Sequence, residues 1–103
     1  MNPKEYLIVL GNNARKRHRH ETDKGRVVTF LVQLEIQHQG KWLPILRYDS
    51  AHGISHVDRY NLAGEQQKDW LNLTFEEALT YADVDINENW ENYKQRFLRG
   101  LFP

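Results

Sequence analysis

Residues 27–38 alternate between apolar and polar side chains, and this period of two predicts a β-strand. A strand with one apolar and one mostly polar face is typical of an antiparallel sheet that buries a single side. Val27 and Leu31 interrupt the polar side. The apolar face consists of Val28, Phe30, Val32, Leu34 and Ile36, and the polar face of Thr29, Gln33, Glu35 and Gln37.

Turn residues divide the sequence that follows into further short strands. Gln39-Gly40 predicts a hairpin turn, and Pro44 in the returning strand suits an edge or a bulge because it cannot donate a ladder hydrogen bond. Connections this short make neighbouring strands antiparallel. We expect an antiparallel meander of three to four strands, or of five if residues 5–10 join it. The later strands are predicted at 41–48, 55–61 and 65–72, with turns at 50–53 and 63–64.

The last thirty residues have helical spacing. Thr74 and Glu77 form a capping box, which predicts a helix start. Asp83-Val84-Asp85 interrupts the apolar stripe, and Asp85 offers a second start. We therefore expect an α+β fold in which two C-terminal helices pack on one face of the sheet. The two apolar stripes consist of Phe75, Ala78, Leu79 and Ala82, and then of Trp90, Tyr93, Phe97 and Leu101.

Length and composition predict one domain over residues 1–103. Of these residues 40% are hydrophobic, enough for a core, and the absence of cysteine excludes disulfides and thiolate zinc sites. The apolar run at residues 6–10 is too short for a signal peptide or a membrane span, so we expect a cytoplasmic protein. Phosphate-binding loops and the serine-hydrolase elbow are missing, which disfavours nucleotide-driven enzymes and serine hydrolases. We expect no cofactor.

Residues 12–26 are polar and charged, and we expect an exposed loop or arm there. A solvated flexible segment is the simplest interpretation. A phosphate- or RNA-contacting arm is the alternative, and His18 with His20 supplies only two of the three ligands that zinc usually needs. The candidate nucleic-acid-binding residues are Arg15, Lys16, Arg17 and Arg19.

The charge of the chain is neutral overall but divided between its two parts. Residues 1–60 contain ten Lys/Arg and six Asp/Glu, whereas residues 61–103 contain four and eight. Such polarity favours head-to-tail self-association, or binding of phosphate at the basic end. A protein partner or a homodimer is therefore one expectation, and RNA is another.

The segment from Arg47 to Asp58 contains the candidate catalytic residues. Residues two apart on a strand point the same way, so His56 and Asp58 should be neighbours. A carboxylate beside an imidazole can orient it as an acid, a base or a metal ligand. Asp49 and His52 could converge on them from the turn. The candidate set is Arg47, Asp49, His52, His56 and Asp58.

Three interpretations of this segment stay open. In the simplest, Asp49 and Ser50 bond the turn backbone, Gly53 supplies an unusual backbone angle and the histidines are partly exposed. In the second, His52 or His56 serves a metal-free acid/base or RNA-cleaving site, with Arg47 or Arg59 at the phosphate during attack of a ribose 2′-hydroxyl. In the third, His52, His56 and Asp58 bind a metal ion, although their spacing matches no specific signature.

The segment 42–53, followed by His56 and Asp58, resembles an uncharacterised prokaryotic family with an R-Y-D-[ST]-A-H-G stretch and then H-x-D. The similarity covers roughly residues 27–100. A looser resemblance is to TumE-type toxins of toxin–antitoxin pairs, which carry R-Y-D-[NS]-A-H after a hydrophobic strand. Of the histidine-rich segment that follows in those toxins, only His56 remains. The matching residues are Arg47, Tyr48, Asp49, Ala51 and His52.

These observations lead to two functional hypotheses. The first is a toxin-like or RNA-processing domain, which follows from the resemblance, the histidines and the basic segment. The second is a protein-interaction or assembly module without catalysis, which follows from the divided charge and the lack of a specific catalytic signature.

Overall fold

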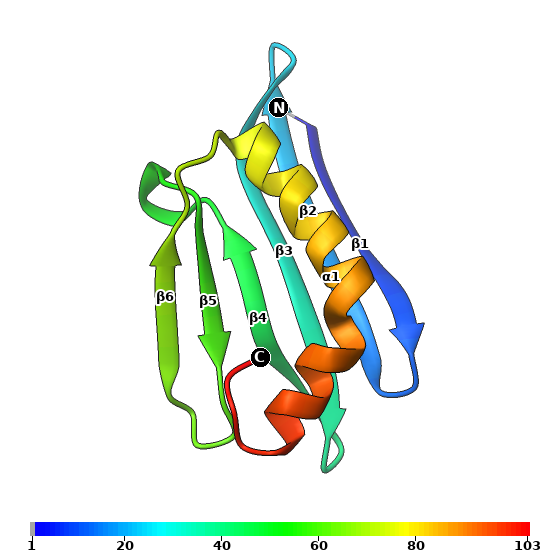
Figure 1. Cartoon of the computed structure of the whole chain (residues 1–103). Helices are drawn as coiled ribbons and strands as arrows, with labels where there is room; N and C mark the ends of the chain where they lie inside the picture. Colours follow the sequence, from blue (N-terminus) through cyan, green and yellow to red (C-terminus); the bar gives the residue numbers. More distant parts are fainter. Residues whose placement is uncertain (1) are drawn as a thin grey trace.

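The computed structural model describes residues 2–103 as one six-stranded antiparallel sheet with a single long helix packed on one of its faces (Figure 1). The strands follow one another in chain order, so each neighbouring pair is a hairpin or a short connection. The elements are β1 (Asn2–Gly11), β2 (Ala14–Asp23), β3 (Arg26–His38), β4 (Lys41–Asp49), the 3-10 turn η1 (Ala51–Gly53), β5 (His56–Tyr60), β6 (Gln66–Trp70) and α1 (Phe75–Leu98).

The expected α+β class and the antiparallel meander are confirmed, but the expected numbers of strands and helices are wrong. The sheet has six strands rather than three to five, because residues 5–10 do form a strand and the segment expected as an arm forms another. One continuous helix replaces the predicted pair, and no helix of residues 2–103 is long and apolar enough to cross a bilayer.

Residues 12–26 are not an exposed arm but contain the whole of β2, the strand between β1 and β3. Lys16 is 1% exposed and His18 6% exposed, since both point toward α1. The Lys16 ammonium donates to the carboxylate of Asp83 and the amide oxygen of Asn87, both on α1. A buried ammonium is tolerated only when it is paired and hydrogen-bonded, and these helix residues meet that condition.

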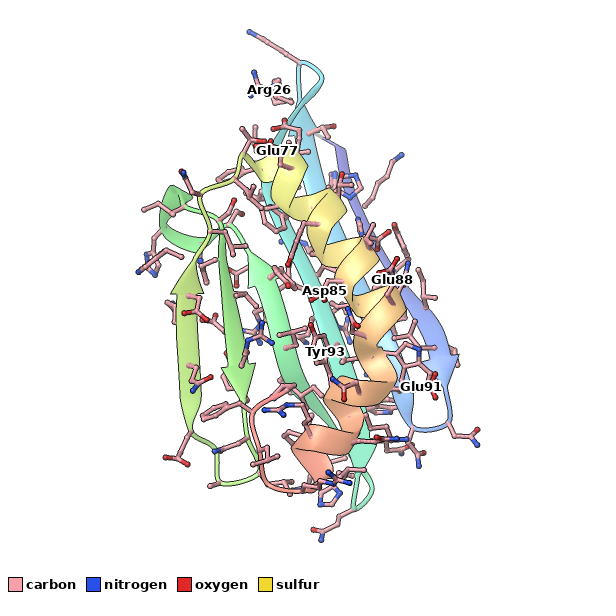
Figure 2. The ribbon with its side chains drawn as sticks, in the orientation of Figure 1. Arg26, Glu77, Asp85, Glu88, Glu91 and Tyr93 are labelled. Carbon is pink, nitrogen blue, oxygen red and sulfur yellow. The ribbon has the colours of Figure 1, made fainter. Side chains whose placement is uncertain are left out.

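The helix continues through Asp83-Val84-Asp85 because both acids have tertiary partners. The Asp83 carboxylate forms an ion pair with the Lys16 ammonium. Asp85 accepts from the Tyr48 hydroxyl at 2.6 Å, from the Tyr93 hydroxyl at 2.7 Å and from Asn89 at 2.9 Å. Asp85 and Tyr93 lie along the same side of α1 (Figure 2). The predicted capping box is confirmed: Thr74 accepts from the Glu77 amide, and the Glu77 carboxylate accepts from the Thr74 amide.

The core lies between α1 and strands β2, β3 and β4, with β3 most closely against the helix. It confirms the apolar face predicted for β3 except at Val28, which is only partly buried. The close approach of the β1–β2 end to α1 depends on Gly11, where a Cβ would stand 2.6 Å from the Trp90 ring. The buried apolar side chains from β3 and α1 are Phe30, Val32, Leu34, Ile36, Ala78, Ala82, Ile86 and Phe97.

Candidate functional site

Four of the five candidate catalytic residues lie on the face of the sheet opposite α1. Tyr48 reaches α1 through Asp85, so the alternating neighbours Arg47 and Asp49 point to the other face. The pairing of β4 with β5 sets Arg47 opposite Asp58 and Asp49 opposite His56. We call this helix-free side the open face.

His56 is the centre of the arrangement and is 1% exposed. Its Nε2 lies 2.7 Å from Oδ1 of Asp49 and 3.4 Å from Oδ2 of Asp58. Its Nδ1 lies 3.1 Å from the carbonyl oxygen of Ile54. Trp70 of β6 packs edge-on against the imidazole, with ring centroids 5.5 Å apart. The structure therefore places His56 and Asp58 side by side, as their spacing predicts, and adds Asp49 across the strand pair.

His52 does not join this group. It lies in the exposed turn η1, where its φ of 64° is left-handed. The turn agrees with the simplest interpretation in two respects: Asp49 Oδ1 accepts from the Ala51 amide at 3.0 Å, and Gly53 has a φ of 75°. It differs in two others, because Ser50 Oγ accepts from the Phe30 amide of β3 rather than from the turn, and His56 is buried. A general base in RNA cleavage must be within hydrogen-bonding reach of its substrate. Both ring nitrogens of His56 already face protein oxygens. RNA cleavage and the toxin role stay predictions.

Beside the His56 group, Glu35 pairs with two arginines on the same open face of the sheet. It is 4% exposed, and the sequence had suggested a solvated position for it. Its carboxylate accepts from Nε of Arg15 at 2.6 Å, from Nε of Arg17 at 2.8 Å and from Gln33 at 2.6 Å. Burial alone would raise the pKa of Glu35, but these hydrogen bonds together hold it below its usual value. Arg47 extends the network by donating to Gln33 at 2.6 Å.

The four candidate nucleic-acid-binding residues are divided between the two faces of the sheet. Lys16 is enclosed beneath α1, whereas Arg15 and Arg17 bond to Glu35 on the open face. Arg19 lies near Glu21, with 2.9 Å between guanidinium and carboxylate. Each cation therefore has a carboxylate partner inside the chain. Nucleic-acid binding by this group stays a prediction, since alternation along a strand separates residues that looked contiguous in sequence.

The two edges of the sheet differ strongly in their chemistry. In β1, Tyr6 is 44%, Leu7 47%, Ile8 38% and Val9 81% exposed, so apolar side chains are accessible on both faces of this edge strand. Every residue of β6 is also exposed, but its sequence is QQKDW. Charged and polar residues on an edge discourage pairing with another strand, and β1 lacks them along Tyr6–Val9. This feature could not be predicted from the sequence, because a strand pattern does not reveal which strand lies at the edge of a sheet.

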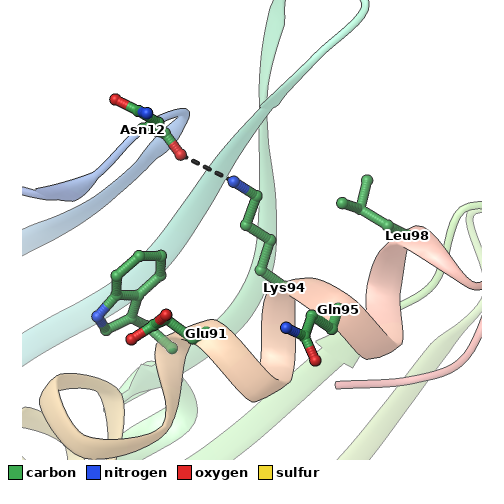
Figure 3. A pocket seen from close by; sticks show the side chains of 6 residues that line it. Asn12, Glu91, Lys94, Gln95 and Leu98 are labelled. Atoms are coloured by element: carbon green, nitrogen blue, oxygen red, sulfur yellow. Dashed lines mark hydrogen bonds between the residues drawn. The ribbon is translucent and has the colours of Figure 1, made fainter.

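A hollow lies between the β1–β2 turn and the C-terminal part of α1, and an internal hydrogen bond spans it (Figure 3). Lys94 extends from the helix and donates to the carbonyl oxygen of Asn12 at 2.8 Å. Trp90 forms the wall of the hollow against Gly11. These contacts join the first hairpin to the helix, and we assign them a structural role.

A family model described as Domain of unknown function (DUF7718) matches residues 1–103. The match confirms the resemblance to an uncharacterised family and extends it over the whole chain. The resemblance to TumE-type toxins is not confirmed and stays a prediction. Neither curated proteins nor solved structures gave a match.

Proposed function

The chain belongs to the family described as Domain of unknown function (DUF7718), which has no activity to transfer, and from its geometry we propose that the domain is an assembly module. In this proposal β1 pairs with β1 of a second copy, and the two sheets become one. The observation that carries the proposal is the run Tyr6–Val9, four apolar residues exposed at a sheet edge.

An edge strand of this kind provides both kinds of interaction that the addition of another strand needs. Unpaired main-chain groups of an edge strand offer hydrogen bonds to an incoming strand, and exposed apolar side chains offer area to bury. Sheets in monomeric proteins usually protect such edges with charge, as Lys68 and Asp69 do on β6. The contrast between the edges therefore favours β1 as the association site.

The sequence of β1 favours a second copy as its partner. A two-fold axis perpendicular to the sheet pairs β1 antiparallel with itself and keeps the α1 sides of both sheets together. With the axis at Leu7, that residue meets its own copy, and Tyr6 meets Ile8 of the second copy. The same register sets Glu5 against Val9, so no like charges face each other.

The test is sedimentation velocity of the purified chain from about 1 µM to about 1 mM, which spans weak to moderate affinities. We expect a concentration-dependent monomer–dimer equilibrium, because pairing of one edge falls short of the ~1,600 Å² of a standard interface. Leu7→Glu should abolish the dimer, since two carboxylates would meet at the axis. Within the monomer the new acid lies opposite Arg17 on β2, so the fold should be retained.

The matched control is Gln67→Glu, which adds the same charge to the exposed opposite edge. It should dimerise like the wild type. A wild-type chain that stays monomeric up to ~1 mM would refute the proposal, as would a Leu7→Glu variant that dimerises normally. Association lost equally in both variants would place the contact elsewhere and would also refute it.

A further inference from the structure

We propose that Asp49, His56 and Asp58 form a binding site for one divalent transition-metal ion on the open face. Each residue offers one ligand atom, and these three atoms lie within 4.8 Å of one another. The site is independent of the β1 edge, since it lies between β4 and β5. The inference differs from the metal site considered from the sequence, which used His52 in place of Asp49.

The environment of His56 presents a cation-binding nitrogen. A carbonyl oxygen can only accept a hydrogen bond, so the contact of Nδ1 with Ile54 places a proton on Nδ1. In the neutral ring, Nε2 then carries a lone pair and faces two carboxylates, which repel it. A metal ion bound to Nε2 removes the repulsion and uses all three groups as ligands. A backbone carbonyl on the other nitrogen is also the usual support of a metal-bound histidine.

Asp58 gives a second, independent observation. Its residue is 4% exposed, and its Oδ1 is buried without a hydrogen-bond partner. A buried carboxylate oxygen without a partner is costly, so native structures rarely leave one. The nearest cation is the Lys68 ammonium, 3.7 Å from that oxygen and beyond hydrogen-bonding distance. The other oxygen, Oδ2, is the one that faces His56 Nε2, so a cation that binds Asp58 through both oxygens would also satisfy Oδ1.

The ligand set indicates which ion fits. One imidazole and two carboxylates suit zinc or a neighbouring first-row metal, whereas magnesium and calcium prefer oxygen alone. Ligands at ~2.1 Å in a tetrahedron stand roughly 3.4 Å apart, which is the separation of Nε2 and Asp58 already. Asp49 must withdraw from its present 2.7 Å, which a side-chain rotation of this partly exposed residue allows. Three protein ligands leave the fourth position for water.

The test uses the chelator-treated full chain titrated with Zn²⁺ alone by calorimetry, and with Co²⁺ to observe its ligand-field absorption. We expect one ion per chain and an increase in the melting temperature, because an ion that binds only the folded state stabilises it. Asp58→Asn and Asp49→Asn should each weaken Zn²⁺ binding by at least ~10-fold, since even outer-shell losses reach that size. Asp69→Asn, on exposed β6, should bind as the wild type does.

Lys68→Gln keeps the proposal testable if a ligand variant fails to fold. Its side chain is partly exposed, and its ammonium competes electrostatically for Asp58, so the variant should bind Zn²⁺ more tightly. Absence of saturable binding at ~1 mM Zn²⁺ would overturn the inference. Binding that is unchanged in both Asp58→Asn and Asp49→Asn would also overturn it, because the ion would then lie at another site.

Discussion

Replacing Asp85 by alanine tests how α1 is attached to the sheet. The Asp85 carboxylate accepts from the Tyr48 hydroxyl at 2.6 Å and from the Tyr93 hydroxyl at 2.7 Å. Tyr48 is 2% exposed, so after the substitution its hydroxyl cannot reach water and is left unsatisfied. Tyr93 is only partly buried and can find water instead. The loss should therefore fall mainly on the Tyr48–Asp85 contact.

The magnitude follows from the contacts. A hydrogen bond to a charged group contributes ~1.5–3 kcal/mol, and the second tyrosine adds a smaller amount. Alanine is the better helix former and offsets up to ~0.7 kcal/mol. We expect Asp85→Ala to lower the free energy of unfolding by about 2–4 kcal/mol. At 4–8 °C per kcal/mol for a domain near this size, the melting temperature should fall by roughly 10–25 °C.

The assay is a double-mutant cycle in urea with Asp85→Ala and Tyr48→Phe. Because both single variants break the same bond, the coupling energy should be about 1.5–3 kcal/mol. Tyr81→Phe is the control, since Tyr81 is 54% exposed and touches Tyr48 only edge-on. Additivity within ~0.5 kcal/mol would refute the proposed role of this contact.

Alkaline pH tests the other tyrosine contact of Asp85, the one with Tyr93. Burial, and then the hydrogen bond to Asp85, raises the pKa of Tyr93 to about 12. A folded-state pKa above the ordinary value near 10 means that the contribution of Tyr93 is complete below pH ~10 and is lost as the pH rises toward 12. Asp85→Ala should therefore flatten the decline in stability across that interval, measured as the urea midpoint. An unchanged slope would contradict the assignment.

Three further predictions concern the rest of the fold. Burial chiefly lowers the pKa of His18, so the unfolded chain binds more protons and the stability of the fold should decrease as the pH drops below ~6.5. Urea midpoints measured at two pH values should show this decrease, and His18→Phe should make the decrease smaller. Glu35→Gln should cost about 1.5–3 kcal/mol in urea unfolding, because the partly exposed guanidiniums of Arg15 and Arg17 lose the charge of the carboxylate to which they donate, whereas exposed Glu5→Gln should cost less than ~1 kcal/mol. Gly11→Ala should cost about 1–3 kcal/mol of stability, because the added methyl group would overlap with the Trp90 ring. A smaller residue in place of Trp90 should recover part of that loss. An equal loss with Trp90 and with the smaller residue would contradict the overlap.

The parts of the fold that could be predicted were those governed by local rules. Alternation over residues 27–38 predicted β3, and the capping box predicted the start of α1. The predicted turns at Gln39-Gly40 and Ala63-Gly64 also lie between strands. Each of these signals depends on residues a few positions apart, so a single sequence contains all the information they need.

The errors came from charges whose partners are distant in sequence. Lys16 and Asp83 are 67 residues apart, so β2 resembled a solvated arm and Asp83 resembled a helix break. Glu35 resembled a solvated residue because the arginines that cover it belong to the same misassigned segment. Polar residues appear exposed in a sequence until the tertiary partners that make their burial tolerable are known.

The candidate site was predictable only in part. The i, i+2 spacing correctly made His56 and Asp58 neighbours, since a strand fixes that geometry. The position of Asp49 depends on the register of β4 against β5, and the exclusion of His52 depends on the course of η1. Neither the register nor the course of a turn follows from residue types alone.

The sequential strand order also determines the sequence of events during synthesis. Each strand of the meander can pair with the one made just before it, and such local contacts form rapidly. The helix that covers the apolar face is made after all six strands, so a nascent chain that has completed β6 still exposes that face to solvent. The interval before α1 emerges is therefore the period in which this protein is most exposed to misassociation, and chaperones that bind apolar surface would act there.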